Sequence, residues 1–172
     1  MTPKLRAALT ALAISLPLDQ ITKILIDRNL VYADRIPVIE GFFYLTHVRN
    51  PGAAFGLFAD GEPVIRLTFF IIVSLLAIGI IVSFFRQLAP GDRLSALALG
   101  LILGGAVGNL IDRIWRGEVV DFLHIKLWHG YSWPDFNLAD SFIVVGVAIL
   151  ILDMVASEGE DRAAPEADEP RA

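Results

Sequence analysis

The sequence predicts an α-helical polytopic membrane protein with four transmembrane helices, and two observations lead to that prediction. Hydrophobic residues make up 55% of the 172 residues and the mean hydropathy is +0.63, which is too apolar for an ordinary soluble domain. Four apolar segments, each near the ~20 residues that a helix needs to cross hydrocarbon, cover residues 5–25, 64–85, 94–111 and 138–155. Because only helices and closed barrels satisfy every backbone hydrogen bond in lipid, we expect four spanning helices.

The spans belong to one membrane-embedded domain, residues 1–156, followed by a short acidic tail. Residues 157–172 hold six Asp or Glu against two Arg and no large apolar residue, so we expect this tail to be disordered. The tail supplies most of the net charge of −5. The first segment follows Lys4 and Arg6, as in a signal peptide, but three more spans follow it. We therefore interpret it as a retained helix.

Residue usage excludes several kinds of site and gives a preference for orientation. The chain has no cysteine, which rules out disulfides, thiol catalysis and Cys-ligated zinc. Its three histidines have no ligand spacing such as HExxH, so no metal site is expected. An even number of spans puts both termini on one side. Lys4, Arg6, Arg86 and Arg93 flank the helices there, and the positive-inside rule favours the cytoplasm, although the total count of basic residues does not decide.

Two outer loops are expected, at about residues 27–63 and 113–137. The first is long for a connector, and residues 42–48 have the aromatic and β-branched content of a strand before a turn signal at Asn50-Pro51-Gly52. The second holds all three tryptophans of the chain. Tryptophan prefers the headgroup level of a bilayer, so we expect this loop to lie along the membrane surface.

Two carboxylates stand out because each lies between apolar neighbours beside a predicted span. Asp121 follows Val119-Val120 and precedes Phe122, and Asp140 stands at the head of the last span. A carboxylate where the chain enters or leaves lipid is costly to keep charged and usually has a function. Two close carboxyls cannot both ionise, so one retains a proton and the pair can serve as acid and base. The sequence therefore favours an aspartyl dyad, with the proton assigned to the pair.

Each aspartate also has a simpler interpretation. Asn137 is suited to be a helix N-cap, and Asp140, three residues later, would then complete a capping box. Asp121 would be an ordinary loop acid, an interpretation that its apolar flanks disfavour.

Other polar residues in the spans have two open interpretations. Asn109, Asp112 and Arg113 fall on one helix face, where they either reach water or serve a site. Asp19 and Lys23, four residues apart, either neutralise each other at the membrane boundary or brace the active site.

Glycines at Gly100, Gly104 and Gly108 form a stripe on one predicted helix. In membrane helices such a stripe permits close backbone packing. Contact between helices is therefore the favoured interpretation.

Five blocks of residues follow one another along the chain: Asp19-Gln-Ile-Thr-Lys23, Asn50-Pro-Gly-Ala-Ala-Phe-Gly56, Gly105-Ala-Val-Gly-Asn-Leu-Ile-Asp-Arg113, Val119-Val-Asp-Phe122 and Phe136-Asn-Leu-Ala-Asp-Ser141. In these blocks and their order the chain resembles lipoprotein signal peptidase, the bacterial signal peptidase II family. The resemblance covers about residues 5–155 and no block departs from the family pattern.

The resemblance implies an aspartyl endopeptidase of the bacterial inner membrane. The family removes the signal peptide from a prolipoprotein whose +1 cysteine already carries diacylglycerol, cutting just before that cysteine. It needs no metal or organic cofactor and is inhibited by the cyclic peptide globomycin. Its first outer loop contributes a small β-cradle and a short helix that covers the site. We expect a monomer that acts on the periplasmic side, with membrane lipid and the precursor as partners and no nucleic acid.

The resemblance also implies a role for each candidate residue. The catalytic dyad would be Asp121 and Asp140. The residues that line the site and orient the substrate or the dyad would be Asn50, Asn109, Arg113 and Asn137. The supporting or pocket-shaping residues would be Asp19, Lys23, Gly52, Ala53, Phe55, Gly105 and Gly108.

The residues support this function independently on one point. Both aspartates are predicted at the outer membrane surface, and a bond beside a lipid-anchored cysteine lies at that depth. A proton- or ion-coupled transporter is the alternative, but it predicts charges near mid-membrane and internal repeats, which we do not see. A non-catalytic scaffold leaves the two aspartates unexplained, and a presenilin-like protease lacks its GxGD pattern.

Overall fold

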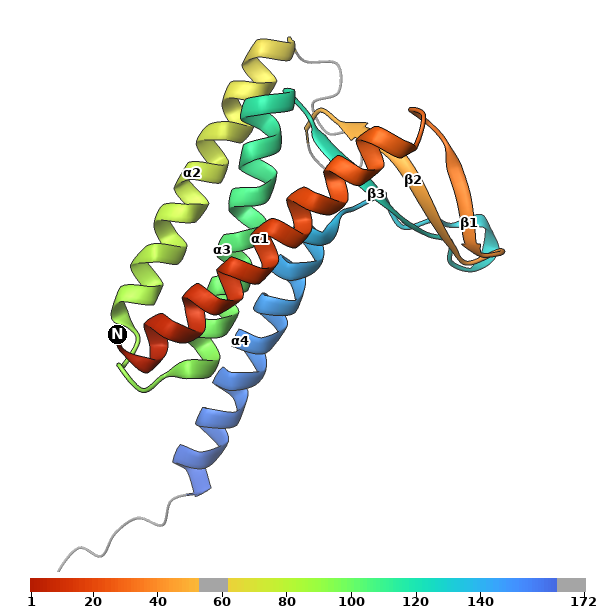
Figure 1. Cartoon of the computed structure of the whole chain (residues 1–172). Helices are drawn as coiled ribbons and strands as arrows, with labels where there is room; N and C mark the ends of the chain where they lie inside the picture. Colours follow the sequence, from red (N-terminus) through yellow and green to blue (C-terminus); the bar gives the residue numbers. More distant parts are fainter. Residues whose placement is uncertain (53–61, 164–172) are drawn as a thin grey trace, which may run out of the picture.

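The computed structural model describes residues 1–52 and 62–163, which form four long helices and a three-stranded sheet (Figure 1). The helices are α1 (Pro3–Asn29), α2 (Pro63–Gln87), α3 (Arg93–Arg116) and α4 (Leu138–Ala163). The strands are β1 (Arg35–Ile39), β2 (Phe43–Asn50) and β3 (Val119–Ile125), and a single 3₁₀ turn, η2, covers Trp128–Gly130.

All four helices are long and apolar enough to cross a membrane, which confirms the predicted fold class. Each begins close to the predicted residue, and α1 and α2 begin at or beside a helix-starting signal. The Thr2 hydroxyl accepts a hydrogen bond from the backbone N–H of Leu5, and proline occupies the first turn of both α1 and α2. Helix α3 ends at Arg116 and is capped by Gly117, whose φ of 79° is the left-handed conformation that glycine adopts most easily.

Helix α4 extends further than its predicted span. The sequence predicts a span that ends near residue 155 and a disordered tail from residue 157, whereas the helix continues to Ala163. Glutamate and alanine are compatible with a helix, and the first proline after this point is Pro165. Residues 164–172 lie outside the described part of the chain.

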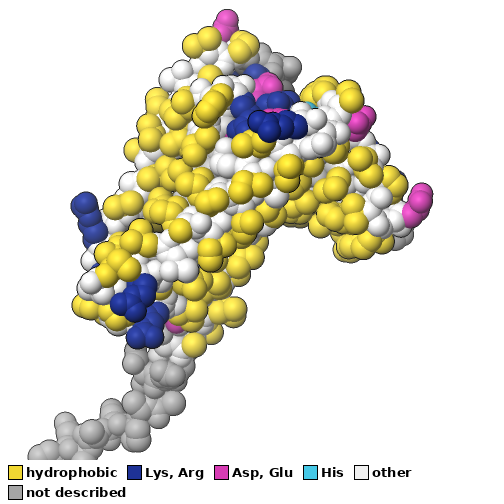
Figure 2. Space-filling model, in the orientation of Figure 1, with side chains coloured by type: hydrophobic (Ala, Val, Ile, Leu, Met, Phe, Trp, Pro, Cys, Tyr) yellow, Lys and Arg dark blue, Asp and Glu magenta, His cyan; other side chains and the backbone are white. Residues whose placement is uncertain are grey.

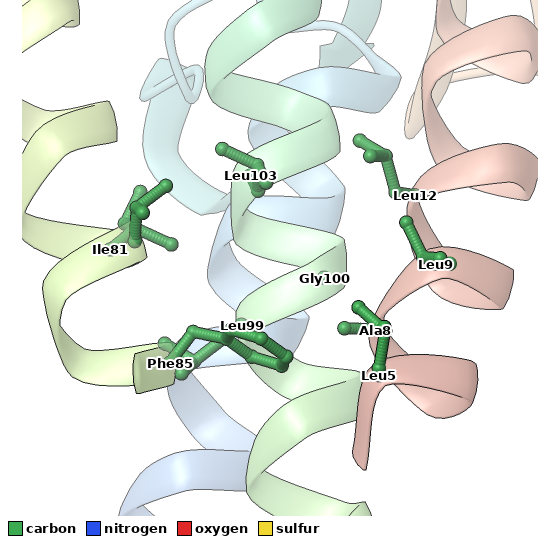
Figure 3. Close-up of a pocket in the computed structure, with 10 residues that line it drawn as sticks. Leu5, Ala8, Leu9, Leu12, Ile81, Phe85, Leu99, Gly100 and Leu103 are labelled. Carbon is green, nitrogen blue, oxygen red and sulfur yellow. The ribbon is translucent and has the colours of Figure 1, made fainter. Parts of the chain in front are cut away.

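Helix α3 lies at the centre of the bundle, along both α1 and α4, while α2 packs mainly against α3 (Figure 1). No described residue of α2 is fully buried, so most of its surface is left for lipid. Figure 3 shows one consequence of this arrangement. Apolar side chains of α1, α2 and α3 line a cavity of about 170 Å³ beside Gly100. Since no polar group lines it, this cavity offers no chemistry.

The sheet projects sideways from one end of the bundle, in the order β1-β2-β3 with antiparallel neighbours (Figure 1). Strand β2 confirms the strand predicted at residues 42–48. Strand β3 was not predicted, because its first four residues are all buried and its sequence shows no alternation of apolar and polar residues. Val120 and Phe122 of β3 pack against Ile26 of α1 and join the sheet to the bundle.

The first outer loop contributes β1 and β2, as the resemblance implies for a β-cradle. Residues 53–61, which include Ala53 and Phe55, lie outside the described residues, and with them the part of the loop between the sheet and α2. Figure 2 shows hydrophobic side chains over the length of the helices, with Lys and Arg gathered mainly near the two ends of the bundle.

Candidate active site

A cavity of about 350 Å³ at the sheet end of the bundle brings Asp121 and Asp140 together. It lies between α2, α3, α4 and β3, and the segment before α4 closes one side. Its lining is Asn50, Gly52, Phe70, Asn109, Arg113, Val119, Asp121, Trp133, Pro134, Asp135, Phe136, Asp140 and Val144. Two carboxylates that are 19 positions apart in the sequence thus share one polar cavity at the end of the spans.

Asp121 reaches the cavity because it lies on β3, two residues after the strand begins. The residue is 2% exposed, and both carboxylate oxygens accept hydrogen bonds from amides. The Asn50 Nδ2 donates to Oδ2 at 2.9 Å, and the Asn137 Nδ2 donates to Oδ1 at 2.7 Å. Pairing of β2 with β3 places Asn50 opposite Val119, close to this carboxylate.

Asp140 lies in the first turn of α4 and forms the capping box that the sequence left open. The Asp140 backbone N–H donates to Asn137 Oδ1 at 3.0 Å, and the Asn137 backbone N–H donates to Asp140 Oδ2 at 3.2 Å. The other carboxylate oxygen accepts a hydrogen bond of 2.8 Å from Asn109 Nδ2. Asp140 therefore caps its helix and faces the cavity at the same time.

Three asparagine amides hold the two carboxylates, and the surroundings determine which way each amide points. The Asn50 Oδ1 accepts from the backbone N–H of Gly52, so its Nδ2 turns to Asp121. The Asn109 Oδ1 accepts from Lys23 Nζ, so its Nδ2 turns to the other carboxylate. Asn137 links the two halves, since its Nδ2 also donates to Asn109 Oδ1 at 3.3 Å. These hydrogen bonds therefore fix the orientation of both carboxylates.

The electrostatics of the cavity favour a shared proton. Burial is the largest cause that raises the pKa of Asp121 from its ordinary value of 3.8 to about 7, and the negative charge of Asp140 acts in the same direction. Hydrogen bonds from Asn50 and Asn137 and the charge of Lys23 oppose this rise. Asp121 therefore retains a proton to a higher pH than an ordinary aspartate does.

Lys23 and Asp19 are fully buried on α1 and connect the dyad to the helix bundle. The Lys23 Nζ lies 2.9 Å from Asp19 Oδ2, 2.8 Å from Asp112 Oδ2 and 2.9 Å from Asn109 Oδ1. The Asp19 Oδ1 accepts a hydrogen bond of 2.9 Å from the backbone N–H of Ala139, the residue before Asp140. Asp19 and Lys23 therefore neutralise each other, and they also connect α1 to α3, which carries Asn109, and to α4, which carries Asp140.

The remaining candidate residues occupy two kinds of position. Arg113 lines the cavity, donates to the Asn109 carbonyl oxygen at 3.1 Å and lies over the ring of Phe70, 5.4 Å from its centroid. Gly52 also lines the cavity. Gly105 and Gly108 do not. A Cβ at Gly105 would meet the Ala139 carbonyl oxygen, and a Cβ at Gly108 would meet the Asp19 carboxylate. Both glycines lie where helices touch. Gly108 belongs to the glycine stripe that predicts such contact, whereas Gly105 lies outside that stripe.

Sequence reasoning did not identify several residues of this site. Within the cavity these are Phe70, Val119, Trp133, Pro134, Asp135, Phe136 and Val144. In the buried network they are Gln20 and Arg116, which contact the carboxylate of Asp112. The sequence indicated Asp112 only as one of three polar residues on a helix face. No local signal distinguishes these residues, because their positions follow from how distant segments pack. Among the described residues, no group of three His, Cys, Asp or Glu is arranged to hold a metal ion.

Similarity to known proteins agrees with this geometry. A family model described as signal peptidase (SPase) II matches residues 11–156. A lipoprotein signal peptidase of Geobacter sulfurreducens is 54% identical over 144 residues, which cover 84% of this chain and 88% of that protein. A lipoprotein signal peptidase of Bacillus pumilus is 45% identical over 138 residues, covering 80% and 85%.

Solved structures agree as well. A bacterial membrane enzyme solved by the in meso method at 2.3 Å resolution superimposes with a TM-score of 0.78 at 32% identity, covering 95% of this chain and 94% of that one. A second such enzyme, at 1.9 Å resolution, gives a TM-score of 0.75 at 33% identity, with 86% and 91% covered. The family match, the close relatives and the shared fold together show that this chain belongs to the signal peptidase II family.

Proposed function

We propose that this member of the family is an aspartyl endopeptidase in which Asp121 and Asp140 cut the signal peptide from a prolipoprotein just before its diacylglyceryl cysteine. The observation that carries the proposal is the hydrogen-bonded arrangement of the two carboxylates in one cavity at the end of the spans. A peptidase needs two carboxyl groups in a fixed orientation, which explains why three asparagine amides bind them. The transporter alternative does not account for a site at one end of the bundle.

The proposed reaction follows from the shared proton. The ionised carboxylate removes a proton from a water molecule as that water attacks the peptide carbonyl carbon, and the protonated carboxyl donates its proton to the carbonyl oxygen. The tetrahedral intermediate collapses when the new C–OH is deprotonated and the leaving amine receives a proton. A pKa of about 7 at Asp121 supports one protonated and one ionised acid near neutral pH. The proton is still a property of the pair.

The walls of the cavity suit a substrate that is itself in the membrane. Phe70 of α2 and Val144 of α4 line the cavity with apolar side chains beside the two acids, and Trp133 lines it as well. A diacylglyceryl group holds the adjacent peptide bond at the membrane surface. Enzyme and precursor would then meet by diffusion in the plane of the bilayer, and the removed signal helix would leave sideways into lipid.

The proposal includes the setting of the enzyme. We place the active site on the periplasmic side of the inner membrane with both termini in the cytoplasm. The enzyme acts as a monomer without a cofactor, and a globomycin-type cyclic peptide inhibits it. Arg113, between Phe70 and the dyad, would orient the substrate backbone, while Asn50, Asn109 and Asn137 orient the dyad.

Two substitutions test the catalytic assignment. Asp121→Asn and Asp140→Asn each keep the size of the side chain but remove the acid. We expect each to lower the rate of cleavage of a diacylglyceryl precursor by ~10²–10⁴-fold or more, measured in detergent or in membranes. Asp92→Asn, at the opposite end of α3, is the control and should cleave at the normal rate. Retained activity in either dyad variant, at normal folding, would refute the assignment of that residue.

A further inference from the structure

Another hollow lies at the end of the bundle opposite the sheet, between the beginnings of α1 and α3. Its volume is about 320 Å³, and its lining is Pro3, Arg6, Ala7, Thr10, Arg93 and Leu97. Figure 2 shows Lys and Arg side chains gathered at this end. The proposed function uses none of these residues. The chemistry of the hollow is two guanidinium groups, one hydroxyl and an apolar floor.

Contacts at its base hold the hollow in shape. The Lys4 backbone N–H donates to the Pro90 carbonyl oxygen at 3.3 Å, and Lys4 Nζ donates to the carbonyl oxygens of Phe85 and Leu88. These bonds tie the first turn of α1 to the turn that precedes α3. The ammonium group of Lys4 is therefore bound at the end of α2, whereas Arg6 and Arg93 line the hollow.

The charge at this place is not balanced within the described residues. Arg6 and Arg93 are both exposed, and among the described residues neither makes an ion pair. The first turns of α1 and α3 contain no acidic residue, so the positive ends of both helix dipoles add to the two cations. Two described acids at this end of the bundle have other positions. Asp92 precedes α3, and Asp153 accepts a hydrogen bond from the Ser95 hydroxyl. Neither lines the hollow.

We propose that this hollow binds the phosphate of an anionic phospholipid, with Arg6 and Arg93 as its two ligands. Arginine suits a phosphate because its planar group donates two parallel hydrogen bonds. Ala7 and Leu97, which line the hollow, belong to two helices that are long and apolar enough to cross a membrane, and Leu97 is an exposed apolar side chain. Apolar lining beside the two cations suits a lipid, whereas a free anion would not need it. Basic pockets between transmembrane helices at a membrane surface are typical sites for anionic headgroups. The cavity of Figure 3 has no polar lining and could hold only hydrocarbon.

The test compares lipid binding by the full chain and its variants. The protein, purified in an uncharged detergent, is titrated with phosphatidylglycerol and bound lipid is counted by native mass spectrometry. We expect Arg6→Gln and Arg93→Gln each to weaken binding about fivefold, and the double variant more. Arg86→Gln is the matched control, because it removes one positive charge at the same end of the bundle without changing the lining. It should bind within about twofold of the unchanged protein.

Three results would overturn the proposal. The first is that Arg86→Gln weakens lipid binding as much as Arg6→Gln or Arg93→Gln does, and the second is that phosphatidylcholine binds as tightly as phosphatidylglycerol. The third is that millimolar inorganic phosphate displaces the lipid completely, which would make the hollow a free-anion site. Precursor cleavage is measured on the same samples and should be normal in all three single variants, because the hollow is remote from the dyad. Lipid binding tests this proposal and precursor cleavage tests the proposed peptidase function, so the failure of one can be distinguished from the failure of the other.

Discussion

Asp121 shows what an acid at this position costs the folded protein. Its carboxylate accepts two amide hydrogen bonds, yet burial outweighs them and raises its pKa to about 7. The folded state therefore binds this proton more tightly than the unfolded state does. As a result, the free energy of unfolding decreases as the pH rises from 3.8 to about 7. Each pH unit in that interval contributes ~1.4 kcal/mol, so a neutral side chain avoids a cost of up to ~4 kcal/mol.

We predict that Asp121→Asn is more stable than the unchanged protein at pH 8 although it is inactive. The asparagine keeps one of the two amide hydrogen bonds of Asp121 and loses the other, at a cost of ~1–2 kcal/mol. This cost is smaller than the free energy that the folded protein spends on ionising the buried carboxyl group at pH 8. The expected net gain is ~2–3 kcal/mol at pH 8, and at pH 4 the gain should vanish or reverse. Thermal unfolding in detergent at both pH values measures the difference. A variant that is less stable at pH 8 would show that Asp121 is not a strained acid.

At the scale of single elements, the position of the first turn of α4 determines where Asp140 lies. Its first turn is fixed by the capping box of Asn137 and Asp140 and by the bond from the Ala139 N–H to Asp19. Gly105 lets α3 come close to that turn, because a side chain there would meet the Ala139 carbonyl oxygen and the side chain of Ile143.

We predict that Gly105→Ala separates α3 from α4 and weakens both stability and cleavage. The new methyl group would cost ~1–3 kcal/mol of stability through overpacking. It should also lower the cleavage rate, because Asn109 on α3 would no longer meet Asp140 at hydrogen-bond distance. Melting temperature and cleavage rate are measured on the same preparation.

Gly79→Ala is the matched control for this change, since a Cβ at Gly79 has no atom within 4 Å. It should leave the melting temperature and cleavage rate at or above normal values. If both alanine variants behave alike, close approach of the helices at Gly105 does not matter to the site.

At the scale of the whole molecule, a series of alternating charges joins the bundle to the sheet. It runs from Asp19 through Lys23, Asp112, Arg116 and Asp27 to Arg49 on β2. Opposite charges alternate along it, so each buried group has a partner, as burial in a protein interior requires. Through Lys23 and Asn109 the same series reaches the dyad.

We predict that Lys23→Met strongly destabilises the protein, because it leaves Asp19 and Asp112 with one cation fewer in a fully buried place. Removing one partner of a buried ion pair costs ~3–5 kcal/mol. The double variant Asp19→Asn with Lys23→Met restores neutrality and should recover part of that loss, while cleavage stays low because Asn109 has lost its orienting contact. Thermal unfolding and cleavage assays report the two effects separately. No recovery in the double variant would mean that packing, not charge, explains the loss.

The sequence by itself determined the four spans, strand β2 and the turn after Asn50, and it singled out Asp121 and Asp140 as candidates for catalysis. Each of these depends on composition or spacing within a short segment, and the cost of placing polar groups in lipid makes such local patterns informative. Resemblance to a family added the expected roles of the asparagines. Nothing local indicates that Asn109 binds Asp140, and the capping box predicted at Asn137 does not indicate its bond to Asp121.

Only the tertiary structure decided that β3 is a strand, that Asp140 both caps α4 and faces the cavity, and that Lys23 orients Asn109. These features arise where segments distant in sequence meet. A hydrogen bond between residues 86 positions apart, like that from Lys23 to Asn109, leaves no periodic trace in either segment. The hydropathy of a short segment determines whether it lies in the membrane, whereas the packing of the helices against the sheet determines which side chains form the site.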